Sequence, residues 1–89
     1  MLSGKRICVV MPAYNAAATL RKTLDEIDRT VVDEIIVVDD ASQDGTVEMA
    51  RGLGLHTLVH PRNRGYGGNQ KTCYTASLRT GADVVILLH

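Results

Sequence analysis

The aliphatic run Ile35-Ile36-Val37-Val38 and the two carboxylates that follow it, Asp39 and Asp40, constrain the fold more than any other segment. Four successive aliphatic residues are typical of a strand that is buried on both faces, as in a parallel sheet. A polar turn that contains a glycine follows in residues 41–45. Because open α/β sheets bind ligands beyond the carboxyl ends of their strands, the two acids mark a candidate site.

Similar apolar runs and helical periodicities divide the remaining chain into alternating strands and helices. Pro12 is expected to end the first strand, because proline lacks the N–H that a ladder hydrogen bond needs. Asp44 or Ser42 is expected to cap the second helix, and Gly81 to terminate the third. The signals predict strands over residues 7–11, 35–39, 55–59 and 84–88 and helices over 20–31, 46–51 and 69–80. Such alternation predicts an α/β, Rossmann-like parallel sheet of order 3-2-1-4 with helices on both faces.

Length and charge narrow the class of protein. The 89 residues, 45% of them hydrophobic, suffice for one small domain over residues 1–89. The 10 basic and 10 acidic residues are interspersed, which argues against a nucleic-acid partner. Cys8 and Cys73 are expected to be reduced, buried thiols. No apolar run approaches the ~20 residues of a membrane span and no signal peptide is recognisable, so a cytoplasmic location is expected.

The chain stops directly after its last predicted strand, with no helix to cover that side of the sheet. We therefore expect a truncated domain. An uncovered strand exposes backbone N–H and C=O groups together with apolar side chains. Self-association through this edge or face is the expected consequence.

Parallel strands bring several polar clusters to one rim of the predicted sheet. For Asp39 and Asp40, one carboxylate can cap the next turn while the other is solvated, or one can accept a base N–H or a ribose hydroxyl. Adjacent acids point in different directions, so at most one of them faces a ligand directly. Asn15 can cap the first helix, or the segment Pro12-Ala13-Tyr14 can receive a nucleotide, with the Tyr14 ring against the base.

The loop from Pro61 to Gly68 combines glycines with cations ahead of a predicted helix. Arg64 and Lys71 are candidates for phosphate binding, through charge and through nearby backbone N–H groups. No Walker pattern is present, and the glycines follow the third strand rather than the first, contrary to a dinucleotide fingerprint. His56 and His60 have no acidic partner nearby in sequence, so a metal site there is not expected, and no nucleophile and base arrangement is recognisable.

Taken together and in order, these segments resemble the N-terminal half of the inverting family 2 nucleotide-sugar glycosyltransferases, in particular the dolichyl- or polyprenyl-phosphate mannose synthases. The resemblance rests on Val9 to Asn15, on Glu34 to Thr46, which is similar to the family's Val-Asp-Asp-Gly-Ser-x-Asp-Gly-Thr segment, and on Asn63 to Val85. Ala41 replaces the usual glycine after the acid pair. Tyr66 stands where many members carry Lys or Arg, which leaves phosphate contact to Arg64 or Lys71.

The resemblance implies a GT-A-type fold, here truncated, and a parent enzyme that transfers a sugar from a nucleoside-diphosphate sugar to an acceptor hydroxyl or lipid phosphate with inversion. The parent is expected to use a divalent cation, Mg²⁺ or Mn²⁺. The resemblance also makes a membrane-associated parent enzyme an expectation. The family's metal motif follows the strand at 84–88, which makes His89 a candidate for its first residue, and the general base lies farther on. No metal and no turnover are therefore expected for the 89 residues alone.

Within the chain, the resemblance assigns donor binding to Pro12, Ala13, Tyr14, Asp39, Asp40, Arg64 and Lys71, and catalytic roles to none. The main alternative is a non-catalytic nucleotide-binding or assembly module. Measuring whether the isolated chain binds a nucleotide tests this alternative. An NAD-type Rossmann domain is disfavoured because Met11 to Asn15 stands where its glycines belong.

Overall fold

The computed structural model describes residues 1–88 and consists of four strands and three helices in alternation. The elements are β1 (Ile7–Ala13), α1 (Ala17–Asp25), β2 (Glu34–Asp39), α2 (Thr46–Gly52), β3 (His56–Val59), α3 (Gly65–Arg79) and β4 (Val84–Leu87). Gly81, with φ of 73°, follows the last turn of α3 in the left-handed conformation expected of a helix-terminating glycine.

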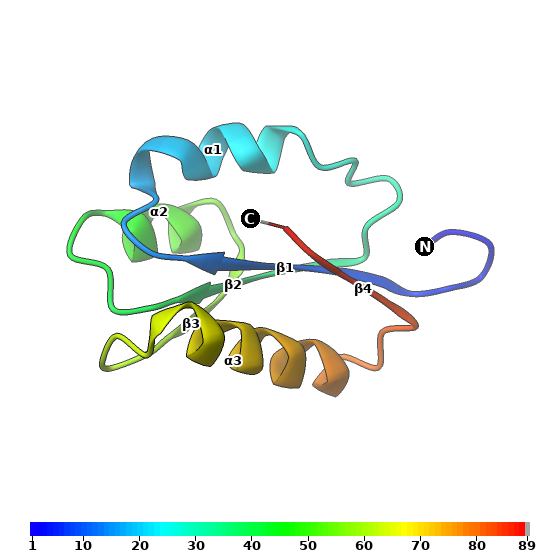
Figure 1. Cartoon of the computed structure of the whole chain (residues 1–89). Coiled ribbons are helices and arrows are strands. Elements are labelled where there is room, and N and C mark those ends of the chain that lie inside the picture. Colours follow the sequence, from blue (N-terminus) through cyan, green and yellow to red (C-terminus); the bar gives the residue numbers. More distant parts are fainter. Residues whose placement is uncertain (89) are drawn as a thin grey trace.

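All strand pairs are parallel and the strand order is β3-β2-β1-β4, as predicted. Figure 1 shows α1 and α2 on one face of this sheet and α3 on the other. The order follows from right-handed crossovers that lead outward from β1, first through β2 to β3 and then across to β4. The predicted Rossmann-like α/β fold is confirmed.

Each face of the sheet carries its own apolar core. Alternate residues of β1 face opposite sides, so that Val9 and Met11 pack beneath α1 and α2 while Cys8 and Val10 pack against α3. This double burial is why the central strands read as uninterrupted aliphatic runs. Both thiols are free and fully buried, and burial raises the pKa of Cys73 to about 11, so neither is a reactive thiolate.

The first strand continues through Pro12, contrary to the expectation that the proline ends it. The carbonyl of Ala13 accepts the N–H of Asp40 from the β2 side, whereas the carbonyl of Val10 accepts the N–H of Leu88 from the β4 side. Since backbone groups alternate sides along a strand, Pro12 faces the β4 side, where the paired residues end at Leu87. The missing N–H therefore interrupts no ladder between β1 and β2.

Two helices differ from their predicted limits. α1 ends at Asp25, although Ile27 of the predicted stripe still packs on the core from beyond the helix end. α3 begins at Gly65, four residues before the predicted start, so the glycines that were expected to form a loop make up its first turn. Within residues 1–88, no helix combines the length and apolarity that crossing a membrane requires.

Candidate functional site

The carboxyl ends of β1 and β2 lie side by side. Ala13 is in register with Asp39, and the N–H of Asp40 donates to the carbonyl of Ala13 at 2.9 Å. Tyr14 follows Ala13 directly, so it shares one edge of the sheet with both acids. This arrangement confirms the predicted convergence of the Pro12 to Tyr14 segment with the acid pair.

The Asp40 side chain is only 3% exposed, and its two oxygens are bound from two other parts of the chain. Its Oδ1 accepts the N–H of Arg64 at 2.7 Å and contacts His60 Nδ1 at 2.9 Å, while its Oδ2 accepts the N–H of Gly65 at 3.0 Å. Burial opposes ionisation of this carboxyl, but the hydrogen bonds from Arg64, His60 and Gly65 outweigh it and hold the pKa of Asp40 below its ordinary value. Asp40 is therefore an ionised carboxylate at neutral pH.

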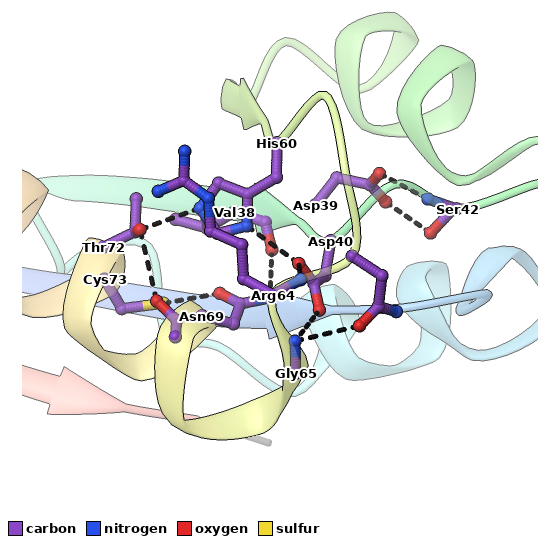
Figure 2. A network of polar contacts seen from close by, with 12 residues as sticks. Val38, Asp39, Asp40, Ser42, His60, Arg64, Gly65, Asn69, Thr72 and Cys73 are labelled. Atoms are coloured by element: carbon purple, nitrogen blue, oxygen red, sulfur yellow. Dashed lines mark hydrogen bonds and ion pairs between the residues drawn. The ribbon is translucent and has the colours of Figure 1, made fainter.

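Asp39 has a different surrounding. It is fully buried, and its oxygens accept the Ser42 N–H at 2.9 Å and the Ser42 hydroxyl at 2.5 Å. These bonds hold the turn after β2, in which Ala41 takes the left-handed φ of 61°. Figure 2 shows Asp39 turned toward Ser42, whereas Asp40 is turned toward His60 and the start of α3. Asp40 is thus the acid of the pair that faces a pocket.

That pocket has a volume of about 380 Å³ and opens at the sheet edge. Its walls come from β1, from the segment after β2 and from the first turns of α3: Pro12, Ala13, Tyr14, Asp40, Asn63, Gly65, Tyr66 and Asn69. Two aromatic rings, Tyr14 and Tyr66, are each 54% exposed beside it. The pocket thus combines one buried carboxylate with flat apolar surfaces, which suits a planar ligand that carries N–H donors.

Asn69 is a pocket residue to which the sequence reasoning gave no role. It is 3% exposed, and its Nδ2 donates to the carbonyl of Val38 at 3.0 Å, which ties α3 to β2. The signal in the sequence is a row of small residues at four-residue spacing, the polar Asn69 and Ser77 with Cys73 between them, on the buried face of α3. An amphipathic helix ordinarily presents larger apolar residues there.

Arg64 and Lys71 lie apart from the first pocket. Their side chains line a second hollow of about 540 Å³ along α3, together with Leu58, Thr72 and others. The backbone N–H of Arg64 serves Asp40, but its side chain packs over Gly68 on the other side of the turn. The predicted donor residues are therefore divided between two hollows, except for Asp39, which lines neither of them.

The start of α1 is closed by the loop between β2 and α2. The N–H of Ala16 donates to Thr46 Oγ1 at 2.9 Å, and the N–H of Ala17 donates to Asp44 Oδ2 at 3.2 Å. Asn15 does not cap this helix: it has a left-handed φ of 48°, and its Oδ1 accepts the N–H of Gln43. Since these α1 amides are used within the protein, they are not open to a phosphate.

The described residues do not form a metal centre. Within residues 1–88, no three His, Cys, Asp or Glu side chains lie close enough together to hold a metal ion. His56 Nδ1 lies 3.1 Å from Glu34 Oε1, and His60 contacts Asp40, so both histidines have carboxylate partners that were not apparent from their neighbours in sequence. His89, the candidate first residue of the metal motif, lies outside the described residues.

Sequence comparisons find relatives that match nearly the whole chain. An uncharacterised protein of Methanocaldococcus jannaschii is 35% identical over 85 residues, which are 96% of this chain and 35% of that protein. The undecaprenyl-phosphate mannosyltransferase of Micrococcus luteus is 31% identical over 87 residues, 91% of this chain and 36% of the relative. The chain thus spans about a third of the length of these relatives.

A solved structure extends the similarity to the fold. Glucosyl-3-phosphoglycerate synthase from Mycobacterium tuberculosis, in complex with Mn²⁺, uridine diphosphate and glucosyl-3-phosphoglycerate, superposes with a TM-score of 0.77 at 29% identity, over 96% of this chain and 33% of that one. The family model described as glycosyl transferase family 2 matches residues 8–88. With its strand order, its acid pair at the sheet edge and this match over nearly its whole length, the chain belongs to glycosyl transferase family 2.

Proposed function

We propose that residues 1–89 form the donor-nucleotide-binding part of an inverting glycosyltransferase that uses a nucleoside-diphosphate sugar. The proposal rests on one observation: Asp40, an ionised carboxylate, lies in the wall of a pocket at the carboxyl edge of the sheet. An ionised carboxylate only accepts hydrogen bonds, so it selects a ligand N–H such as that of a nucleobase. The complex of the related synthase with uridine diphosphate supports uracil as the base.

In this proposal, several pocket residues each make their own contact with the donor nucleotide. Asp40 accepts the base N–H, the exposed Tyr14 ring packs against the base, and Pro12 and Ala13 supply a flat wall with no bulky side chain. Asp39 stabilises the turn after β2 through its hydrogen bonds with Ser42 and does not contact the donor directly. Phosphate contact by Arg64 or Lys71 stays a prediction, and it requires these long side chains to reach around the start of α3.

Sugar transfer itself belongs, in this proposal, to a longer protein. A divalent cation would supply charge neutralisation for the leaving diphosphate there, and a carboxylate would deprotonate the acceptor where that acceptor is a hydroxyl. The described residues supply neither group; they bind and orient the donor. The relative that is named as an undecaprenyl-phosphate mannosyltransferase supports a lipid phosphate as acceptor, and hence membrane association of the full-length enzyme.

A titration of uridine diphosphate into the ¹⁵N-labelled chain, followed through its amide resonances, tests the donor site even where binding is weak. Asp40→Asn should weaken binding about tenfold or more, since a hydrogen bond to a charged group is worth roughly 1.5–3 kcal/mol. Asp25→Asn is the control, because Asp25 is 69% exposed on α1, away from the pocket. Unchanged affinity for a folded Asp40→Asn variant would remove the proposed role.

The same proposal includes self-association of the chain. β4 is an edge strand in the described part of the sheet, and Val84 and Ile86 expose apolar surface on its α1 side. Unprotected strand edges beside apolar surface favour pairing with a second copy. Sedimentation over a range of concentrations measures this directly.

A further inference from the structure

His60 is a buried polar residue that bridges the end of the sheet and α3. It is 5% exposed, and it follows β3 directly, with its backbone N–H donating to the Asp39 carbonyl at 2.8 Å. Its ring contacts Asp40 Oδ1 through Nδ1 at 2.9 Å and the Thr72 hydroxyl through Nε2 at 2.7 Å (Figure 2). The backbone and both ring nitrogens are therefore fixed, so the ring has one orientation relative to the pocket.

The acceptor capacity of Asp40 is almost used up within the protein. An ionised carboxylate offers about four lone-pair positions, two on each oxygen. Among the described residues, Oδ1 takes two donors, His60 Nδ1 and the Arg64 N–H, whereas Oδ2 takes one, the Gly65 N–H. Because the carboxylate can only accept, His60 Nδ1 carries the proton in this contact. The capacity that remains for a ligand is thus on Oδ2.

We propose that His60 is a positioning residue of the donor pocket, whose Nδ1–H occupies Asp40 Oδ1 and so presents Oδ2 to one N–H of the nucleobase. The inference rests on the proposed function. His60 does not touch the ligand, since it is not part of the pocket wall. Without the imidazole donor, the carboxylate can rotate and accept the N–H groups of Arg64 and Gly65 in other combinations, so the free lone pair no longer has a fixed direction.

A pair of amide substitutions separates the two contacts of the ring. In His60→Asn the amide nitrogen takes the place of Nδ1 and can still donate to Asp40, whereas in His60→Gln the amide reaches the position of Nε2 and keeps the Thr72 contact instead. His56→Asn is the matched control, because His56, at the start of β3, is 52% exposed and contacts Glu34 instead of Asp40. The three variants and the unaltered chain are titrated with uridine diphosphate and with its N3-methyl analogue, which lacks the base N–H.

We expect the unaltered chain, His60→Asn and His56→Asn to prefer uridine diphosphate over the N3-methyl analogue by about tenfold, the worth of one hydrogen bond to a charged group. His60→Gln should lose most of this preference while it binds the analogue as the unaltered chain does. Equal losses for both ligands, or an unchanged preference in His60→Gln, would overturn the positioning role and leave the proposed function intact. Failure of the unaltered chain to bind uridine diphosphate would overturn both.

A measurement on the unaltered chain covers the case in which His60→Gln does not fold. The Nδ1 proton of His60, observed by its ¹⁵N-coupled resonance, should shift when uridine diphosphate binds, because Asp40 then shares its charge with a further donor. The N3-methyl analogue should shift it far less. A resonance that responds equally to both ligands, or to neither, would contradict the inference.

Discussion

At the scale of single residues, two neighbouring acids with the same chemistry have opposite tasks. Asp39 accepts hydrogen bonds from Ser42 and so stabilises the turn after β2, while Asp40 accepts hydrogen bonds from His60 and from the start of α3. The difference arises because successive side chains of a strand point to opposite sides. The sequence predicted that at most one acid meets a ligand, but the choice between them depends on partners 20 to 25 residues later in the chain.

The stability of the chain should fall in acid because of these carboxylates. Hydrogen bonds lower the pKa of Asp28, Asp33 and Asp44, and for Asp40 they outweigh the opposing effect of burial. A folded-state pKa below the unfolded value of about 3.9 stabilises the protein fully above that pH, and the contribution is lost as the pH falls through the folded-state pKa. Urea unfolding should therefore give a similar free energy at pH 7 and pH 5 and a lower one at pH 3.

Asp40→Asn provides the control for this pH dependence. The variant should be less stable at pH 7 by about 1.5–3 kcal/mol, because an amide cannot accept all three donors, and its loss between pH 5 and pH 3 should be smaller. An equal acid loss in both proteins would show that Asp40 does not contribute to it.

At the scale of elements, Asp44 joins the starts of two helices. Its Oδ2 accepts the N–H of Ala17 at the start of α1, and its Oδ1 accepts the N–H of Thr46 at the start of α2. Asp44→Ala should lower the free energy of unfolding by about 1–2 kcal/mol, the upper range for a lost helix cap. Asp25→Ala, which removes an exposed carboxylate of α1, should cost less than about 0.5 kcal/mol. Similar effects of the two substitutions in urea unfolding would contradict the double cap.

The first turn of α3 allows a second matched comparison. A Cβ added at Gly68 would lie 2.7 Å from the Arg64 Cβ, whereas one added at Gly67 would meet nothing within 4 Å. Gly68→Ala should therefore destabilise the chain by about 1–3 kcal/mol through overpacking. Gly67→Ala should be neutral or stabilising by up to about 1 kcal/mol, because alanine is the better helix former. Thermal unfolding of both variants tests the order, and a more stable Gly68→Ala would refute it.

The first turn of α3 also shows which features of the fold could not be predicted from the sequence. The strands and their order could be predicted because each buried aliphatic run is a local signal. The start of α3 could not, since the N–H groups of both Arg64 and Gly65 are satisfied by Asp40, 24 and 25 residues earlier, and only that of Gly65 also has a local acceptor, Asn63 Oδ1. The amides at the start of α1 are likewise satisfied by Thr46 and Asp44, which lie 30 and 27 residues away. For the site, topology alone brought Tyr14 and Asp40 together, but it did not separate Arg64 and Lys71 from them.

At the scale of the whole molecule, the apolar surfaces are unevenly covered. Residues of β4 lie beside a hollow of about 520 Å³ lined mostly by aliphatic side chains, which are Leu2, Ile7, Val31, Val32, Val84 and Ile86. Ile86 is 45% exposed there. Leu78, on α3 at the opposite face of the sheet, is more exposed, at 74%, but it lies on a helix and not at a strand edge. Substitutions of Ile86 and Leu78 can therefore distinguish self-association through the strand edge from self-association through exposed hydrophobic residues in general.

The sedimentation coefficient of the unaltered chain should rise with concentration as copies pair through β4. Ile86→Lys should weaken this association about tenfold or more, because burying an isoleucine is worth roughly 1.5–3 kcal/mol and a charge at a strand edge opposes pairing. Leu78→Lys should associate as the unaltered chain does, because the proposed contact does not include α3. An equal loss in both variants would point to non-specific hydrophobic contact, and a chain that stays monomeric at the highest concentration would exclude pairing through this edge.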